Sequence, residues 1–466
     1  MTRLVIMKNV SVSDLNARLS HYLREVGRGM NVPRTFAALA SFIFAAACMA
    51  SDGGSTTTQP NWRTVRVARG DTTVVRTVGV GRDSSRLRLV EEVSIGKRDG
   101  TADETFTFIA RVRPTPDGGI ILTDGIRPAA TQVKMFSGAG SFMRNIGRIG
   151  RGPGEYSSPS AIAVAPRGEL LVWASMRVNV YAPNGDFKTS WAAPSTSGQF
   201  VDASGRVYSD ATMNDPELPD SLVAPSGMHV QRNIAIRTSL DGVVIDTIVS
   251  PRARISRRLF ACAVNSACPD RIVAPQPNQF VAYSLIAIPY VPLFVSAISP
   301  LGYYVSGDAA HFAIMLETHD GKPLRIESDR AALTIDALER RERYEHIRAK
   351  AQEIAPSDIA RTKPFFRHLR VDEDGRIWVW LSQPSVRIPV ADTVRAAAAG
   401  TSKYTWSEVS VYDVFAPTGE FLGSVRLPER ATFAAAKDNK LWLTLTDDLD
   451  VPRVVRYRIE GLRQDR

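Results

Sequence analysis

Polar side chains that could bind a ligand or support chemistry recur at the ends of predicted strands and in the loops that follow them. Carboxylates gathered around one opening can bind calcium, and a histidine within reach of a substrate can act as a general base. The candidate ligand-binding residues are Asp124, Arg127, Glu155, Arg177, Asp210, Asp308, His311 and Trp380. The weaker candidates for a metal site are Asp447, Asp448 and Asp450.

Histidines are scarce in the sequence, and only His311 directly follows a predicted strand at a loop where a general base would be useful. Its catalytic partner is not identified by spacing. The sequence has no Gly-x-Ser-x-Gly, His-Glu-x-x-His or Cys-x-x-Cys pattern and no EF-hand spacing. The sequence therefore has no motif that indicates nucleophilic or zinc-dependent catalysis, and calcium is the one cofactor that it leaves possible.

Four glycines crowd together at Gly147, Gly150, Gly152 and Gly154. Glycine-rich loops that cradle phosphates lie between a strand and a helix. Here a second alternating strand pattern follows the loop, and no Lys-Ser or Lys-Thr pair closes it. The pattern favours a connector between repeated units over a nucleotide site.

Residues 147–187 show one complete repeat, in which the glycine loop is followed by strand, turn, strand, loop, strand and turn. The turn between the first two strands of such a unit occurs six times along the chain. These turns are Asp117-Gly118, Arg167-Gly168, Ser204-Gly205, Leu301-Gly302, Asp374-Gly375 and Asp438-Asn439. The turn between the third and fourth strands occurs only five times, so the last unit lacks its outer strand.

A strand at residues 87–95 precedes the first repeat and has no partner of its own. Pairing it with the last predicted strand, at residues 454–459, would complete the sixth unit and remove two open sheet edges. The sequence therefore predicts an all-β, six-bladed β-propeller at residues 62–460, closed by an N-terminal strand and carrying a short helical insertion. A predicted hairpin at residues 64–78 precedes the closing strand in the sequence, and a tail at residues 461–466 follows the last strand.

The connector Arg151-Gly152-Pro153-Gly154-Glu155-Tyr156 and the hairpin Asn184-Gly185-Asp186-Phe187 resemble six-bladed, NHL-like propellers of bacterial lipoproteins. The closing stretch at residues 449–457 is similar to the last blade of that family. The resemblance implies an extracytoplasmic binding or scaffold module more than any reaction. Propeller lactonases, which hold calcium in their central tunnel, are the enzymatic alternative.

Residues 30–61 indicate where in the cell the protein is located. Residues 36–47 are too short to cross a bilayer and have the proportions of a signal peptide. The ending Ala45-Ala46-Ala47-Cys48 resembles a lipobox, which implies lipidation of Cys48, a tether at residues 48–61 and, with Met49 next, the outer membrane. An ordinary signal peptide cut after an Ala-x-Ala site is the alternative.

Residues 1–29 precede this signal peptide and resemble the start of a prevent-host-death antitoxin, too short to be complete. An artefactual leader upstream of Met30 is favoured over a genuine cytosolic extension.

The net charge of +10 carries little information about partners, because residues 1–47 supply +4 of it. No run of basic residues interleaved with aromatics indicates nucleic-acid binding. We expect a monomer that reaches the membrane by its lipid anchor only, and whose partner is a peptide, a glycan or a protein.

Long insertions occur only in the loops that would open on one face of the ring, at residues 211–230, 251–279, 329–363 and 383–406. Such asymmetry usually marks a binding face. In an exported protein Cys262 and Cys268 are predicted to form a local disulfide. An amphipathic helix is predicted over residues 334–352, with Glu339 paired with Arg343. Its apolar face comprises Ile335, Leu338, Tyr344, Ile347 and Ala351. A lid packed on the rim of the propeller is favoured over a helix that docks a partner.

Overall fold

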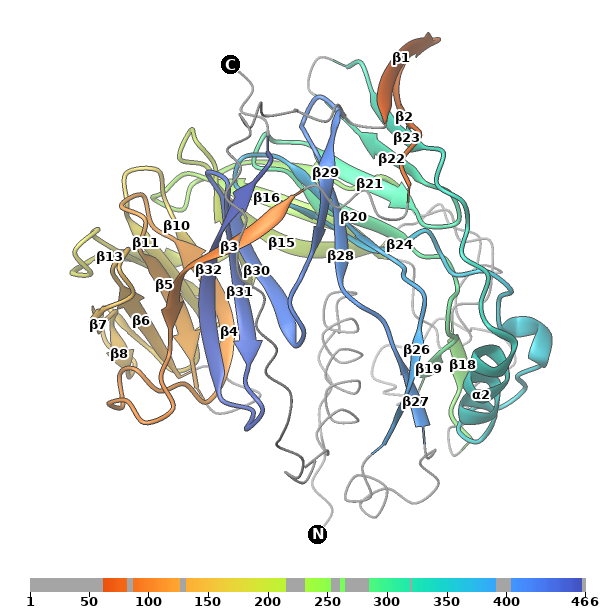
Figure 1. The fold of residues 1–466 in the computed structure, drawn as a ribbon. Helices are drawn as coiled ribbons and strands as arrows, with labels where there is room; N and C mark the ends of the chain where they lie inside the picture. Colours follow the sequence, from red (N-terminus) through yellow and green to blue (C-terminus); the bar gives the residue numbers. More distant parts are fainter. Residues whose placement is uncertain are drawn as a thin grey trace, which may run out of the picture.

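The structure is a computed structural model that describes residues 62–81, 87–125, 131–214, 231–252, 260–264, 285–318, 321–390 and 404–462. Its sheets stand around a common axis and confirm the predicted six-bladed, all-β propeller with one helical insertion (Figure 1). The segments 1–29, 30–47 and 48–61, with Cys48, lie outside the described residues, as do Arg127 and Cys268. Cys262 is disulfide-bonded.

Blades one to three are four-stranded meanders, with strands given from the axis outwards. Blade one contains β4 (Ile109–Pro114), β5 (Ile120–Asp124), β6 (Gln132–Phe136) and β7 (Phe142–Asn145). Blade two contains β10 (Ala161–Val164), β11 (Leu170–Ala174), β12 (Arg177–Tyr181) and β13 (Phe187–Ala192). Blade three contains β14 (Ser197–Val201), β15 (Val207–Asn214), β16 (Gln231–Thr238) and β17 (Val244–Val249).

Blades four to six follow the same plan. Blade four contains β20 (Phe294–Ile298), β21 (Tyr304–Asp308), β22 (Ala313–Leu316) and β23 (Leu324–Ser328). Blade five contains β24 (Phe366–Val371), β25 (Ile377–Leu381), β28 (Val411–Phe415) and β29 (Phe421–Arg426). Blade six contains β30 (Ala431–Lys437), β31 (Lys440–Thr446), β32 (Pro452–Glu460) and β3 (Arg88–Ile95).

Burial depends on the position of a strand within its blade. Every residue of β11 is buried, because both faces of the blade pack against neighbouring blades, whereas the outer strand β13 is mostly exposed. Second strands such as β5 and β11 therefore read as continuous apolar runs instead of alternating ones. Trp173 of β11 is fully buried and lies flat on Gly198 of blade three, where an added Cβ would come within 2.4 Å of the indole.

The six turns between first and second strands share one backbone requirement. In five of them a glycine has a positive φ, between 79° and 90°. In the sixth, Asp438 and Asn439 take φ values of 49° and 58°, a conformation that asparagine and aspartate tolerate better than other side chains. The repeated turn dipeptides of the sequence thus supply the residues that can adopt the positive φ these turns require.

A buried aspartate stabilises two of these turns. Asp372 accepts hydrogen bonds from the backbone N–H groups two and four residues later, and from Nε1 of Trp378 at 2.9 Å. Asp202 of blade three repeats this arrangement, with the hydroxyl of Tyr208 in place of the indole. The turn is thereby tied to the aromatic core of its own second strand.

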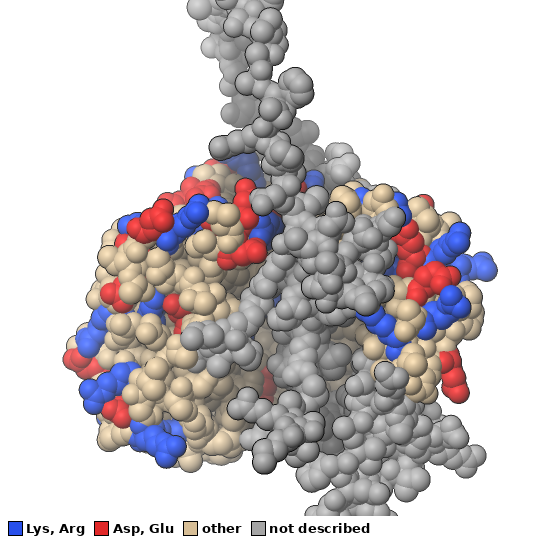
Figure 2. Space-filling view, turned by 90° about the horizontal axis from the view of Figure 1, so that it is seen from below, with Lys and Arg blue, Asp and Glu red and all other residues tan. Residues whose placement is uncertain are grey.

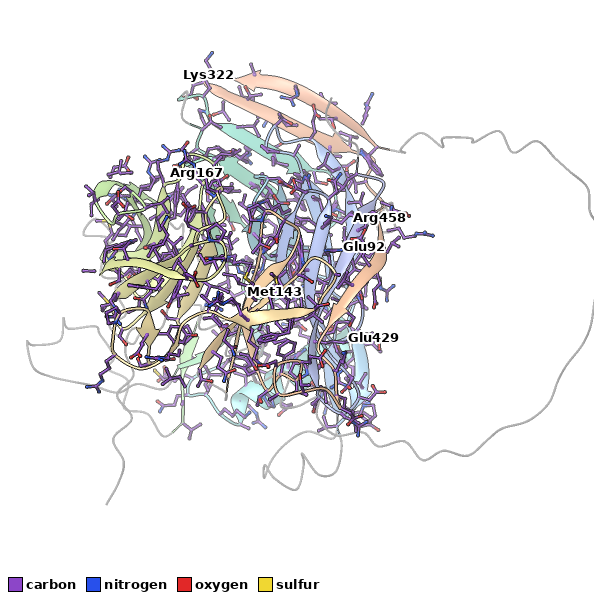
Figure 3. The ribbon with its side chains drawn as sticks, turned by 90° about the vertical axis from the view of Figure 1, so that its left-hand side faces the viewer. Glu92, Met143, Arg167, Lys322, Glu429 and Arg458 are labelled. Carbon is purple, nitrogen blue, oxygen red and sulfur yellow. The ribbon has the colours of Figure 1, made fainter. Side chains whose placement is uncertain are left out.

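The ring closes as predicted, because β3 pairs antiparallel with β32 from Arg88–Glu460 to Ile95–Val454. Arg88 also bonds the side chain of Glu460 at 3.1 Å, and Glu92 accepts from Arg456 at 3.0 Å. Glu92 and Arg458 lie side by side at this seam (Figure 3). The strand that directly precedes blade one in the sequence is therefore the outermost strand of blade six.

The predicted N-terminal hairpin is also present, as β1 (Arg63–Arg69) and β2 (Thr72–Val78). Its location was not predicted. β2 pairs in parallel with β23, so the hairpin extends blade four to six strands. Trp62 packs on Phe421 of blade five with ring centroids 4.9 Å apart, and Leu87 lies against Gly423 of the same blade. The N-terminal strands therefore contact three consecutive blades.

The insertions form a layer at one end of the ring, at the bottom of Figure 1. We call this the mouth layer. It comprises β18 (Phe260–Cys262), β19 (Leu285–Ala287), α2 (Ala337–Arg348), the 3-10 turn η2 (Pro356–Asp358), β26 (Val386–Pro389) and β27 (Tyr404–Ser407). The opposite end, which we call the short-turn face, carries tight turns in the part of the chain that the structure describes, including those of Arg167 and Lys322 (Figure 3).

The helix is shorter than predicted and its buried face differs in part. Asp336 caps the N-terminus of α2 by accepting from the backbone N–H groups of Leu338 and Glu339. Ile347 is buried as predicted, but Leu338 is 45% exposed and Glu339 is buried in its place. The predicted pairing of Glu339 with Arg343 was wrong, because Glu339 turns inwards to Lys363. Within the described ranges no helix is long and apolar enough to span a bilayer.

Candidate functional site

The sequence-predicted residues of blades one and two are engaged in local structure. Asp124 is buried, 3.0 Å from Nζ of Lys134, and accepts from the backbone N–H groups of Thr107 and Phe108. These bonds fasten the loop that enters blade one. Both carboxylate oxygens therefore already have partners within the blade.

Glu155 and Arg177 come together in the glycine-rich connector, which forms the short parallel pair β8 (Arg148–Ile149) and β9 (Glu155–Tyr156). Glu155 accepts from Arg148 at 2.7 Å and from the backbone N–H of Gly152 at 2.8 Å. The backbone N–H of Gly152, and after it the guanidinium of Arg148, hold the pKa of Glu155 below its usual range. Arg177 donates to the backbone oxygen of Glu155 at 2.9 Å. The loop joins blades one and two, as predicted, and a strand follows it.

Asp308 and His311 share one turn after β21. The side chain of Asp308 accepts from the backbone N–H of Ala310 at 2.9 Å, and its backbone oxygen accepts from that of His311. His311 is exposed. Trp380 lies on β25 of blade five, stacked on Tyr412 and covered by the guanidinium of Arg367, 5.7 Å from the ring centroid.

The acidic candidates after β31 lie around a turn and an arginine. Asp447 accepts from the backbone N–H groups of Leu449 and Val451, both at 2.9 Å. Asp448 and Asp450 both pair with Arg430. In the part of the chain that the structure describes, no three His, Cys, Asp or Glu side chains are grouped as metal ligands.

Asp210 stands apart from the other candidates because the pKa of its carboxyl is raised. It lies on β15 between blades three and four, and Gln199 donates to its carboxylate. Burial raises the pKa of Asp210 to about 6 against the opposing effect of Gln199. The nearby hydroxyl of Tyr304 is buried without a hydrogen-bond partner, and burial raises its pKa too.

Sequence reasoning missed a buried ionic cluster at the base of the mouth layer. Nζ of Lys363 lies 2.8 Å from Glu408, 3.6 Å from Glu339 and 2.5 Å from the hydroxyl of Ser385. Tyr290 donates a further hydrogen bond to Glu339. The side chains of Lys363 and Glu339 are only 1% and 2% exposed. Water is thus excluded from a cluster that holds three charged groups.

The members of this cluster come from different insertions. Tyr290 follows β19, Glu339 belongs to α2, Lys363 precedes blade five, and Ser385 and Glu408 flank the hairpin of β26 and β27. Burial raises the pKa of Glu408, but Arg367 and Lys363 outweigh it and the pKa is lowered overall. One lysine therefore ties three insertions together at the mouth.

The outer surface of the mouth layer presents aromatic and apolar groups on this fixed base. Arg387 of β26 lies 3.5 Å from the ring centroid of Tyr404 and pairs with Glu342 of α2 at 2.6 Å. Nε1 of Trp406 donates to the same Glu342 at 2.8 Å. Tyr404 is 39% exposed and Val386 is 63% exposed. Viewed from this end, basic and acidic residues of the described surface are interspersed (Figure 2).

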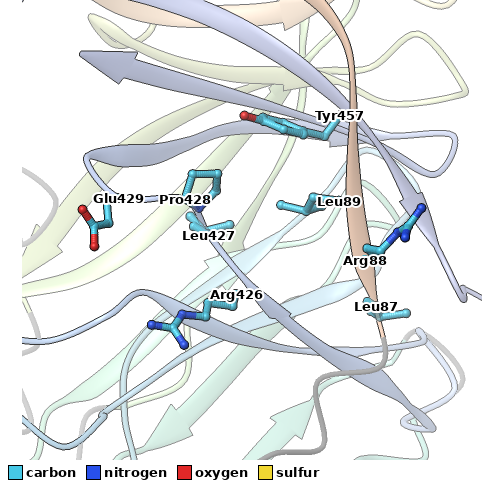
Figure 4. A pocket seen from close by; sticks show the side chains of 8 residues that line it. All are labelled: Leu87, Arg88, Leu89, Arg426, Leu427, Pro428, Glu429 and Tyr457. Carbon is cyan, nitrogen blue, oxygen red and sulfur yellow. The ribbon is translucent and has the colours of Figure 1, made fainter. Parts of the chain in front are cut away.

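A shallow hollow of 470 Å³ lies elsewhere, between blade five and the seam (Figure 4). Its floor is aliphatic, formed by Leu87, Leu89, Leu427 and Pro428, with Tyr457 on one side. The charged groups at its rim are Arg88, Arg426 and Glu429. None of the predicted site residues lines it.

Comparison with known proteins yields structural likeness only. No protein-family profile and no curated protein matches the sequence. A member of the DUF4221 family from Bacteroides vulgatus is 10% identical, with 81% of this chain and 100% of that chain covered and a TM-score of 0.45. A Bacteroides fragilis protein named as exported is 11% identical over 83% and 99% of the chains, with a TM-score of 0.41.

A virginiamycin B lyase from Staphylococcus aureus is 10% identical over 79% and 98% of the two chains, with a TM-score of 0.32. Likeness at this level carries nothing about the ligand or reaction of this protein. The site must be judged from its own residues.

Proposed function

We propose that the protein is an exported binding module that docks a partner protein on the outer surface of its mouth layer. The observation that carries this proposal is the group formed by Arg387, Tyr404 and Trp406 on the hairpin of β26 and β27, anchored to Glu342 of α2. Tyrosine, tryptophan and arginine are the residue types that dominate the energetics of protein interfaces.

The rigidity of the base supports the same proposal. The cluster around Lys363 fixes α2 and the hairpin relative to each other, so their outer surfaces are preorganised and less conformational entropy is lost on binding. Leu338 and Val386, exposed by 45% and 63%, add apolar area to this surface. Exposed apolar groups beside ordered aromatic rings favour contact with another protein over a purely solvated face.

Site-specific photo-crosslinking in intact cells tests the proposal. A photoreactive residue in place of Tyr404 should give a defined adduct, and the additional change Val386→Asp should abolish it. Val244 is a matched control, because it is 58% exposed on the outer strand of blade three, away from the mouth layer. Identical adducts from positions 404 and 244, or calcium-dependent turnover of a lactone by the purified protein, would contradict the proposal.

We further propose that acyl chains on Cys48 hold the protein in the cell envelope. The disulfide-bonded state of Cys262 supports export, since disulfides persist in oxidising compartments. Labelled palmitate should enter the wild-type protein but not the Cys48→Ser variant, and globomycin should block processing. Unlabelled wild-type protein would disprove lipidation and leave the docking surface untouched.

A further inference from the structure

Basic side chains gather where the ring axis meets the short-turn face. Arg111 and Arg113 come from β4 of blade one, Arg370 from β24 of blade five and Lys437 from the end of β30 in blade six. Glu373, in the turn after β24, is the acidic residue that pairs with Lys437, at 3.4 Å. Four cationic groups thus accompany Glu373 and the neighbouring Asp374, which is itself paired with Arg376 at 3.2 Å.

The side chain of Arg113 must reach the axis, because it meets blades that are not its neighbours. Its Nη2 donates to the backbone oxygen of Gln199 in blade three at 2.7 Å, past the inner strand of blade two. It also interacts electrostatically with Glu373 and Arg370 of blade five, on the other side of the ring. A group that approaches blades three and five from blade one lies at the centre of the propeller.

The hydrogen-bonding capacity of this cluster is incompletely used. Nε of Arg113 is buried and has no hydrogen-bond partner, and the same holds for Nδ1 of His368, two residues before Arg370. Burial lowers the pKa of Arg113 to about 10, with Arg111 and Arg370 adding to the effect and Glu373 opposing it. An arginine stays charged at neutral pH even so, and an unmatched buried charge is costly.

We propose that the short-turn end of the axis is a binding site for a small, multiply charged oxyanion such as phosphate, held between Arg113, Arg370 and Lys437. A guanidinium presents parallel N–H groups that match two oxygens of such an anion, and the lysine adds a third donor. Arg111 is exposed and Lys437 is 29% exposed, so the cluster is open to solvent at this face.

Titration calorimetry of the purified protein with inorganic phosphate, at an ionic strength fixed with sodium chloride, tests this site. Arg113→Met should weaken phosphate binding by about ten-fold or more, the usual effect of losing a hydrogen bond to a charged group. Arg167→Met is the matched control, because Arg167 is exposed on the same face and is not among the groups that interact with Arg113, and it should leave the affinity unchanged.

Glu373→Gln gives a prediction of opposite sign, which a general folding defect cannot mimic. Removing the carboxylate of Glu373 raises the net positive charge of the cluster, so phosphate should bind more tightly than to the wild type. Absence of phosphate binding to the wild type, equal affinity of Arg113→Met and wild type, or weaker binding to Glu373→Gln would each overturn the proposal.

Discussion

Replacing Lys363 with methionine should loosen the mouth layer while the propeller ring stays folded. Lys363 is the cation between Glu339 and Glu408, and its side chain is 1% exposed. Methionine retains the length of the aliphatic stem but leaves the two carboxylates with Arg367, which pairs with Glu408, as their counter-ion among the described residues. Removing one partner of a buried ion pair costs about 3–5 kcal/mol in the free energy of unfolding.

The lower end of that range is expected here, because neutral donors remain. Tyr290 and Ser385 still donate to Glu339, and the backbone N–H of Gln383 still donates to Glu408 at 2.8 Å. We therefore expect a loss of about 3 kcal/mol, confined to the mouth layer. Hydrogen exchange should show faster exchange in α2 and unchanged protection in β11 of blade two.

A second substitution separates lost charge balance from lost packing. Glu339→Gln in the Lys363→Met background restores neutrality, since Glu408 and Arg367 then remain as one pair. The double variant should recover at least about 1 kcal/mol of the loss. If Lys363→Met costs less than about 1 kcal/mol, or if the two effects simply add, the cluster does not hold the insertions together.

Two further predictions concern the ring. Asp210, with its pKa raised to about 6, binds a proton in the folded state between roughly pH 4 and 6 that the unfolded chain does not bind, so stability falls as pH rises through this window. Urea denaturation should show Asp210→Asn to be more stable than wild type by up to about 3 kcal/mol at pH 8, with no gain at pH 4. Gly198→Ala should lower the free energy of unfolding by about 2 kcal/mol in thermal denaturation, because the new Cβ would overlap the indole of Trp173. Gly138→Ala, whose nearest atoms would lie at 3.3 Å, should cost less.

The blade count could be read from the sequence because each turn imposes a local requirement. A positive φ at the fourth residue of the turn leaves few choices besides glycine, and Asn439 shows the accepted exception. Ring closure could also be predicted, since a strand without a partner and a blade without an outer strand explain each other.

Contacts between insertions could not be predicted, because the insertions are not part of the sequence repeat and no regular spacing links their residues. Glu339 and Lys363 lie at different points of one insertion and Glu408 follows another, and each reads as an ordinary surface charge. The helix shows the same limit. Its apolar pattern placed Leu338 inwards, but the tertiary pairing of Glu339 with Lys363 rotated the neighbouring position into the interior. The parallel docking of β2 on β23 likewise left no local signal.

The seam between β3 and β32 has a consequence for the order of folding. Arg88 and Glu460 are 372 residues apart, so β3 has no partner until nearly the whole propeller sequence is available. Blades one to five can form from neighbouring segments, but the ring cannot close early, and loop-closure entropy makes this last step slow. Until then β3 and the edge of β31 are open strands that invite pairing with other chains. A cell that makes this protein has to keep those two edges apart from foreign strands until its last strand arrives.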